Sequence, residues 1–140
     1  MNSTPASPIR IAAAVIFDAE GRLLLVKKRG TIFFMQPGSK LEPAETPAQT
    51  LARELREELG CTLRHAEFLG NFSAPAANEP SHIVEAQLFR AEIEGSLAIG
   101  SEIEEMLWVD PSQTGDLSLA PLTKDHILPF ICGRSARSAS

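Results

Sequence analysis

The sequence predicts an α/β fold, in which helices pack on a mixed β-sheet as an α/β/α sandwich. Short runs rich in branched apolar residues, which are typical of strands, recur through the chain. Among them lies one long amphipathic helix, predicted over residues 46–59, and a second helix is predicted over 121–132. The 140 residues suffice for one core, so we expect a single domain over 9–132 between flexible tails at 1–8 and 133–140.

The predicted strands follow the apolar runs. Residues 11–17 and 23–28 are separated by Asp18-Ala19-Glu20-Gly21, and we interpret the two runs as a hairpin. Residues 32–35 form a candidate short strand before a loop at 37–38. After the long helix, the candidate strands are 63–71, 83–93 and 106–109.

Local signals define both ends of the long helix. Thr46 occupies the N-cap, Pro47 the first helical position and Gln49 the third, which is a capping-box pattern. Gly60 is a typical residue for ending a helix. Between these ends, one apolar stripe is formed by Ala48, Leu51, Ala52, Leu55 and Leu59.

Three glutamates of this helix, Glu54, Glu57 and Glu58, have i, i+3, i+4 spacing and therefore share one helical face. One interpretation is a solvated surface with incidental charges. We favour a site for divalent cations, because Mg²⁺ prefers oxygen ligands and would neutralise the converging carboxylates. Helical geometry also predicts that Glu58 lies nearest the core and Glu57 farther out.

Composition and charge exclude several classes of function. The net charge of −5 argues against binding to a nucleic-acid polymer, although metal ions can bridge carboxylates to a small polyphosphate. No apolar run approaches the roughly 18 residues of a membrane-spanning helix, and the first residues lack the apolar stretch of a signal peptide. Cys61 and Cys132 give neither a disulfide framework nor zinc-ligand spacing, so we expect reduced thiols and a cytoplasmic location.

The segment 38–61 resembles the signature of the Nudix hydrolases, G-x5-E-x7-R-E-U-x-E-E-x-G-U, where U is a bulky apolar residue. The first glycine of the pattern falls on Ser39, although Gly38 matches the preceding glycine of the common Gly-Gly pair. The resemblance to this family, in its MutT-like form, implies the Nudix-type α/β/α sandwich around a mixed sheet. The matching residues are Glu45, Arg53, Glu54, Leu55, Glu57, Glu58 and Gly60.

By this resemblance the chain is a Mg²⁺-dependent pyrophosphohydrolase, in which Mn²⁺ can substitute. Glu102 is included in the metal site because many relatives carry a glutamate shortly before a Trp-containing strand, here at Trp108. Glu105 is the alternative in the same segment. The ligands implied are the Gly38 carbonyl and the carboxylates of Glu54, Glu57, Glu58 and Glu102.

The resemblance also implies catalytic roles. A carboxylate must accept the proton of the attacking water, and Glu54 or Glu57 is our first choice, with Glu102 left open. Arg53 would orient a catalytic glutamate through an ion pair. The number of metal ions is left open, and so is homodimer formation.

Other residues are candidates for contact with a nucleotide. Lys28 or Arg29, at the end of a predicted strand, could hold a terminal phosphate, although a solvated strand end would look the same. For phenylalanines near the motif, core packing is the alternative to a base pocket. Candidates for that pocket are Phe34, Phe72, Asn78 and His82.

The expected reaction is attack of water at phosphorus, which cleaves the pyrophosphate linkage of a nucleoside diphosphate derivative. The leading substrate class is a (deoxy)nucleoside triphosphate, including oxidised ones, because the domain is small and carries no additional motif. ADP-ribose or another nucleotide sugar is the first alternative. A Nudix-like module that binds a nucleotide without cleaving it is the second.

Overall fold

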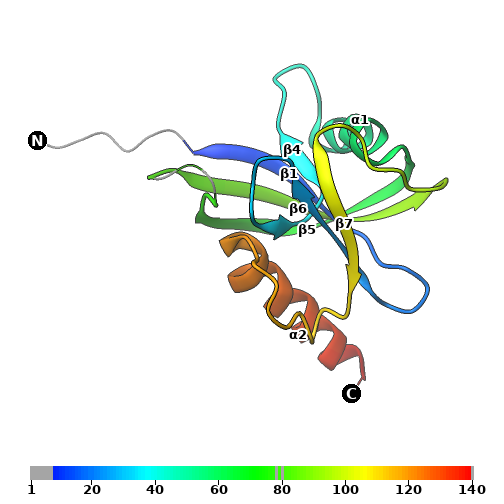
Figure 1. Ribbon diagram of the computed structural model, residues 1–140, viewed down its shortest axis with the longest axis vertical. Coiled ribbons are helices and arrows are strands. Elements are labelled where there is room, and N and C mark those ends of the chain that lie inside the picture. Colours follow the sequence, from blue (N-terminus) through cyan, green and yellow to red (C-terminus); the bar gives the residue numbers. More distant parts are fainter. Residues whose placement is uncertain (1–7, 78, 80, 140) are drawn as a thin grey trace, which may run out of the picture.

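A computed structural model of the protein describes residues 8–77, 79 and 81–139. Its strands form two sheets, and two helical segments lie on opposite sides of them (Figure 1). The first sheet has the order β4 (Gly38–Lys40), β1 (Ile9–Val15), β6 (Ile83–Glu94) and β5 (Thr62–Pro75). The second has the order β3 (Phe34–Met35), β2 (Leu23–Lys28) and β7 (Ile103–Val109).

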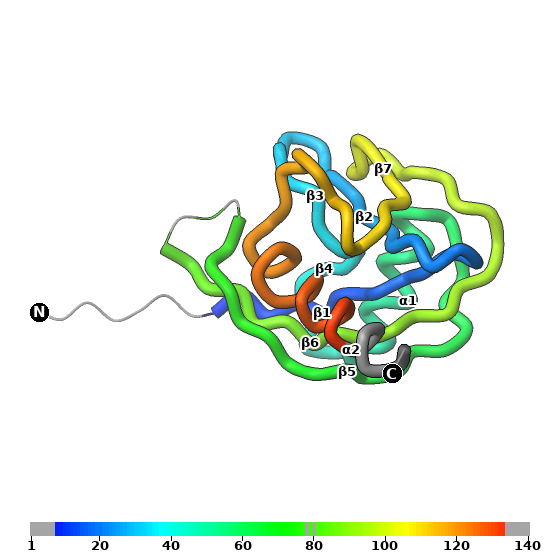
Figure 2. Tube along the Cα trace, turned by 90° about the horizontal axis from the view of Figure 1, so that it is seen from below, coloured from blue at the N-terminus to red at the C-terminus, as the bar shows by residue number. Residues whose placement is uncertain are grey.

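The first sheet is mixed, as predicted. Strands β1 and β6 run parallel, while β4 pairs with β1 and β5 with β6 in antiparallel fashion. The second sheet is antiparallel. Figure 2 shows the strands of the second sheet grouped on one side of the molecule and those of the first on the other.

Two hydrophobic cores follow from this layering. Helix α1 (Pro47–Leu59) packs over one core, and the π-helical segment η1 (Thr123–Ile127) and helix α2 (Leu128–Ala139) cover the other. In β1 and β2, alternate residues point into opposite cores, as the two-residue period of a strand requires. Both strands are therefore covered on both faces, which explains their nearly continuous apolar sequences.

The predicted hairpin is only partly correct. The chain does turn at Asp18–Gly21, and Phe17 forms an isolated antiparallel bridge with Leu23. However, β1 and β2 belong to different sheets, because the two edges of β1 are already paired with β4 and β6. The strand β4 was also missed, since we expected only a loop around Pro37-Gly38.

The C-terminal helical region is longer than predicted. Instead of one helix over 121–132, the π-helical turn η1 precedes α2, which continues to Ala139. Gly133 does not end the helix because it lacks the positive φ of a helix-ending glycine. The predicted tail at 133–140 is thus helical as far as Ala139, whereas the predicted tail at 1–8 lies outside the described residues except for Pro8.

The membrane-spanning potential of the helices and the state of the cysteines were also considered from the sequence. None of the helices in the described residues is long and apolar enough to cross a membrane. Cys61 is buried and Cys132 is half-buried, and both are free thiols.

Candidate active site

Helix α1 carries the acidic face and is anchored as predicted. The Thr46 hydroxyl accepts a hydrogen bond from the Gln49 amide at 3.2 Å, and the Gln49 side chain accepts one from the Thr46 amide at 2.8 Å. Gly60 adopts the left-handed conformation, with φ of 68°, and ends the helix. Since Leu51, Leu55 and Leu59 are buried on the core side, the helix cannot rotate without exposing them, which fixes where its glutamates point.

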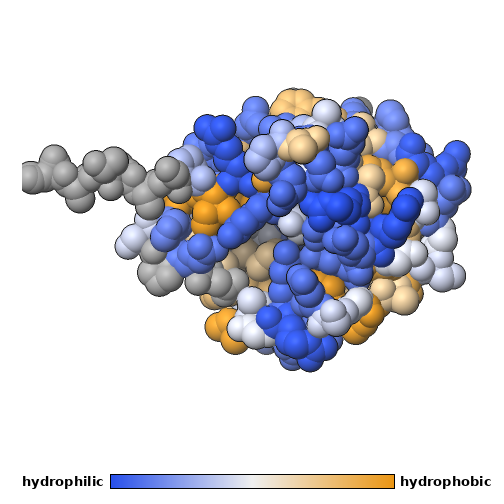
Figure 3. All heavy atoms as spheres, turned by 90° about the horizontal axis from the view of Figure 1, so that it is seen from above, coloured by the Kyte–Doolittle hydropathy of each residue, from blue (hydrophilic) through white to orange (hydrophobic). Residues whose placement is uncertain are grey.

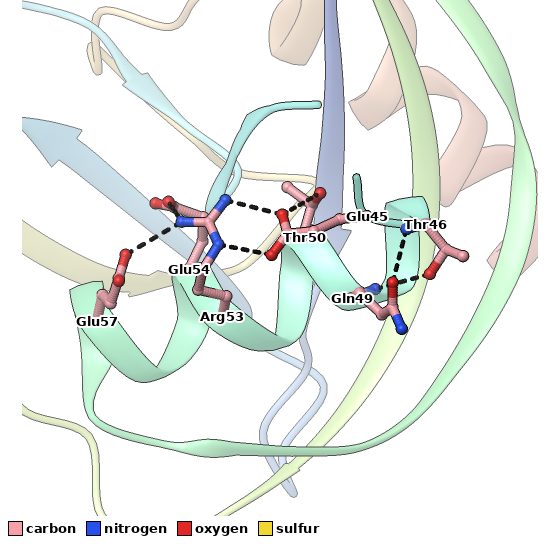
Figure 4. Close-up of polar contacts among 7 residues, drawn as sticks. All are labelled: Glu45, Thr46, Gln49, Thr50, Arg53, Glu54 and Glu57. Carbon is pink, nitrogen blue, oxygen red and sulfur yellow. Dashed lines mark hydrogen bonds and ion pairs between the residues drawn. The ribbon is translucent and has the colours of Figure 1, made fainter. Parts of the chain in front are cut away.

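Arg53 binds three carboxylates at once (Figure 4). Its Nε and Nη2 donate to the two oxygens of Glu45 at 2.9 and 3.1 Å, which is a bidentate pair. Its Nη1 donates to Glu54 at 2.6 Å and to Glu57 at 3.3 Å. One guanidinium therefore sets the positions of two glutamates from the acidic face and one from the loop before the helix.

A further hydrogen bond, from Thr50, fixes the carboxylate of the Glu45–Arg53 pair. The buried Thr50 hydroxyl donates to a Glu45 carboxylate oxygen at 3.0 Å. Hydrogen bonds from Arg53 hold the pKa of Glu45 below its ordinary value, and Glu45 together with Glu54 raises the pKa of Arg53. Glu45 and Arg53 therefore stay charged across the physiological range.

Glu58 lies in a different environment from Glu57. The Glu58 side chain is only 5% exposed, whereas that of Glu57 is 60% exposed, which confirms the predicted order from core to solvent. Burial raises the pKa of Glu58 to about 7, and the charge of Lys28, 3.6 Å away, opposes this rise. Hydrogen bonding to the Glu54 carboxyl and the negative charges of Glu54 and Glu102 raise the pKa of Glu58 further.

Glu102 reaches this cluster through a loop that packs on the end of α1. The Gly100 amide donates to the Glu58 carbonyl at 2.7 Å, and the Ala98 amide donates to the Leu59 carbonyl at 2.9 Å. A Cβ on Gly100 would lie 2.6 Å from the Glu57 carbonyl oxygen, so only glycine allows this approach.

The other side of the loop is tied to the end of β2. The Arg29 amide donates to the Glu102 carbonyl at 2.8 Å, and its Nε donates to the Ser101 carbonyl at 3.0 Å. Glu105, the alternative to Glu102, instead lies 3.8 Å from Lys27. Glu102 is thus the acid of this segment whose charge acts on Glu58.

Gly38 and Lys28 connect the acidic cluster to the sheet. Lys28 Nζ donates to the Gly38 carbonyl at 3.1 Å while facing Glu58. A Cβ on Gly38 would overlap the Ala12 carbonyl oxygen on neighbouring β1, so the backbone requires glycine at this position.

The carboxylates are near one another but do not form a preformed metal cage. Within the described ranges, no group of three or more His, Cys, Asp or Glu side chains is arranged to hold a metal ion. The carboxylates of Glu54 and Glu57 accept hydrogen bonds from Arg53, and that of Glu58 lies 3.6 Å from the Lys28 ammonium group. These three carboxylates are thus paired with cationic side chains. The metal ligands predicted from the sequence therefore stay a prediction.

The residues suggested for nucleotide contact are not all brought together. A cavity of about 420 Å³ is lined by Lys28 and Gly38, but Phe34 lies outside its wall and is buried in the core beside α2. Phe72 packs edge-to-face on Phe130, with ring centroids 5.2 Å apart. Asn78 lies outside the described residues.

His82 is also absent from the cavity wall. Its backbone closes the turn between β5 and β6, where its amide donates to the Glu79 carbonyl at 3.2 Å.

Among the residues of the cavity wall that were not predicted from the sequence are Gln36 and Thr123. Both are buried, and the Thr123 hydroxyl donates to Gln36 Oε1 at 2.7 Å. The only local signal was one polar residue between Met35 and Pro37, and its partner is 87 residues away.

The surface around the acidic helix is polar. Figure 3 views the molecule from the side of α1, where hydrophilic side chains cover most of the face and hydrophobic ones appear in small separate areas.

Comparison with known proteins places the chain in a family. The family model described as NUDIX domain matches residues 8–130. The solution structure of the Escherichia coli ORF135 protein has a TM-score of 0.76 to this chain, with 27% identity and 96% of each chain covered.

Three relatives differ in the activities that their names state. The CTP pyrophosphohydrolase of Escherichia coli is 27% identical, with 94% of this chain and 97% of the relative covered. The 8-oxo-dGTP diphosphatase of Haemophilus influenzae is 30% identical, with 73% and 76% covered. The ADP-ribose pyrophosphatase of Methanocaldococcus jannaschii is 27% identical, with 83% and 68% covered.

Proposed function

The chain belongs to the Nudix hydrolase family and is a pyrophosphohydrolase, and we propose that it cleaves the pyrophosphate linkage of a (deoxy)nucleoside triphosphate. One observation carries this proposal. The acidic cluster around Glu58 meets the 420 Å³ cavity at Lys28 and Gly38. A nucleotide could therefore bind with its phosphates at the acidic cluster and its nucleoside in the cavity beside it.

The donor set fits Mg²⁺. All its ligand atoms are oxygens, and Glu58 is a buried carboxyl whose pKa is raised by burial and by the neighbouring acids Glu54 and Glu102. A bound cation would offset that repulsion. We propose that Glu54, Glu57, Glu58, Glu102 and the Gly38 carbonyl hold it, and that Mn²⁺ can replace it.

When bound, Mg²⁺ polarises phosphoryl oxygens and lowers the pKa of an attacking water. The chain's own residues supply the remaining functions. Glu54 or Glu57 accepts the proton from water, because Arg53 holds both carboxylates in place and Glu57 is open to solvent. Lys28 then contacts the phosphate chain from the cavity side.

The cavity supplies the place for the nucleoside. Its walls combine apolar side chains with a few polar groups, which is the usual composition of a small-molecule site. The relatives named for CTP and 8-oxo-dGTP support a nucleoside triphosphate. ADP-ribose is the second candidate, since one relative is named for it and a nucleoside diphosphate group would occupy the same places.

A nucleotide panel tests the proposal. The wild-type protein, incubated with Mg²⁺ at mildly alkaline pH, should release phosphate or pyrophosphate from at least one nucleoside triphosphate faster than it cleaves ADP-ribose. Faster cleavage of ADP-ribose would transfer the assignment to the second candidate. Tight nucleotide binding without any release would indicate a non-catalytic module.

Glu57→Gln tests the acidic site directly. We expect kcat to fall by roughly a hundredfold or more, because general acid–base groups contribute about that much. Glu67→Gln, an exposed glutamate on β5, is the matched control and should keep full activity. Unchanged turnover in a folded Glu57→Gln protein would contradict the assignment.

A further inference from the structure

One buried polar group in the cavity wall has no partner. Gln36 is 5% exposed, and its Oε1 accepts a hydrogen bond from Thr123 at 2.7 Å. Within the described part of the chain, the Gln36 Nε2 finds no hydrogen-bond partner. A buried donor left in this way costs stability, so its retention calls for a partner, such as a bound ligand.

The position of this amide connects it to the proposed substrate. Gln36 lies between β3 and β4, two residues before Gly38, and both residues line the cavity. Lys28 lines the same cavity and faces Glu58. A molecule with its phosphates at Lys28 could therefore place its other end against Gln36.

Thr123 fixes the orientation of the amide. Its buried hydroxyl, at the start of η1, donates to Oε1, which leaves the two N–H bonds of Nε2 as the free donors. Gln36 and Thr123 lie 87 residues apart in the sequence, so the amide is held by two separate segments of the chain. A side chain held in this way loses little conformational entropy when a ligand binds.

The surroundings indicate the chemistry of the ligand. The cavity wall near the amide includes the apolar side chains of Met35, Ala120 and Leu122, which suit a flat, uncharged ring. A neutral donor in apolar surroundings pairs well with a carbonyl oxygen or ring nitrogen. It is a poor partner for a phosphate, which selects cationic side chains.

We propose that Gln36 is a specificity-determining residue, whose amide donates a hydrogen bond to an acceptor atom on the nucleobase of the bound nucleotide. Thr123 is its positioning residue. This inference rests on the proposed function and adds to it the residue that reads the base.

Substitution of Gln36 tests this role in catalysis. Gln36→Met keeps the length of the side chain and removes its donor, so kcat/KM for the best substrate should fall about tenfold, mainly through KM. The preference for that base over other bases should narrow by a similar factor. Gln87→Met, in half-buried Gln87 of β6 outside this cavity, is the matched control.

Gln36→Glu tests whether the side chain at this position must donate a hydrogen bond to the ligand or accept one from it. The carboxylate can still accept the Thr123 hydrogen bond but offers an acceptor in place of the free N–H group. We expect a loss at least as large as in Gln36→Met. A gain in kcat/KM for any base would show that the ligand presents a donor at this position and would overturn the proposal.

Stability measurements exclude a purely structural role. Gln36→Met combined with Thr123→Val replaces both partners of the hydrogen bond by apolar side chains of similar shape, which is often neutral or stabilising. Its unfolding midpoint should be no lower than that of the wild type, while its base preference is lost. A destabilised double variant that kept the wild-type base preference would overturn the proposal.

A binding measurement that does not depend on catalysis tests the role of Gln36 independently of the proposed hydrolase activity. The Gln36 side-chain amide signals of ¹⁵N-labelled protein without metal are identified by their absence from Gln36→Met. They should shift when at least one of the common nucleoside monophosphates is added. If no nucleotide is cleaved but these signals shift, only the proposed function fails. If nucleotides are cleaved and the signals stay unchanged, a buried water satisfies the amide and the Gln36 proposal fails.

Discussion

At the scale of single residues, Arg53 organises the acidic face. The guanidinium presents its donors in a planar fork, so it can hold Glu45 in a bidentate pair and still reach Glu54 and Glu57. An ammonium group on a flexible chain cannot match this geometry. Arg53 thus contacts one carboxylate oxygen of Glu54 and one of Glu57, and it leaves the second oxygen of each available to other partners.

We therefore expect Arg53→Lys to lower kcat by about tenfold or more, the usual effect of losing a residue that orients metal ligands. Steady-state kinetics with the preferred nucleotide measures the loss. Arg56→Lys, at an exposed position of the same helix, is the control and should change stability by less than about 0.5 kcal/mol. Equal activity of the two variants would show that Arg53 has no positioning role.

Glycine at one position of the signature region has a structural cause. The Gly38 Cα lies against the Ala12 carbonyl of β1, where any side chain would overlap the backbone. The following residue, Ser39, pairs with Ala12 in the β1–β4 ladder. The glycine requirement therefore belongs to Gly38, and a serine fits beside it.

At the scale of elements, α1 acts as a fixed support whose two ends are both constrained. Its N-terminus has the capping box, and its C-terminal carbonyls accept hydrogen bonds from the loop that carries Gly100 and Glu102. The same loop accepts hydrogen bonds from Arg29 at the end of β2. Helix, loop and strand thus hold Glu58 and Glu102 at one place.

Gly100→Ala tests this coupling. The new methyl group would lie 2.6 Å from the Glu57 carbonyl, so we expect a loss of about 1–3 kcal/mol in the free energy of unfolding and a lower kcat. Gly133→Ala in α2 meets no atom within 4 Å and serves as the control, expected to be neutral or slightly stabilising. Denaturant unfolding and kinetics measure both effects. If Gly100→Ala behaved like Gly133→Ala, the packing of this loop would be unimportant.

At the scale of the whole molecule, the site lies where the two sheets and α1 meet. Lys28 comes from the second sheet, Gly38 from the first, and Glu58 from helix α1, which packs over one of the two cores. The region assembles only in the folded chain. A cation bound there should consequently stabilise the folded state.

Mg²⁺ should therefore raise the unfolding temperature of the wild-type protein without nucleotide. At a free Mg²⁺ concentration one hundred times its dissociation constant, the free energy of unfolding should increase by about 2.7 kcal/mol. Glu58→Gln should reduce this response, and Glu67→Gln should keep it. Differential scanning calorimetry with and without a chelator gives the measurement. A response equal in all three proteins would place the cation elsewhere.

The sequence by itself determined α1 and its acidic face. The cap residues, the apolar stripe and the i, i+3, i+4 glutamates all lie within a few residues of one another, so helical geometry alone relates them. For the same reason, the order of exposure from Glu58 to Glu57 and the contact of Arg53 with Glu57 were predictable.

Only the tertiary structure decided what faces that helix. The assignment of β1 and β2 to separate sheets, the action of the Glu102 charge on Glu58, and the pairing of Gln36 with Thr123 depend on segments far apart in the chain. Such contacts form because both faces of β1 and β2 must be buried, and the sheets, helices and loops that cover them bring distant residues together. A local sequence pattern does not specify which distant residue will lie beside it. The acidic helix could therefore be predicted from the sequence, and the pairing of Gln36 with Thr123 could not.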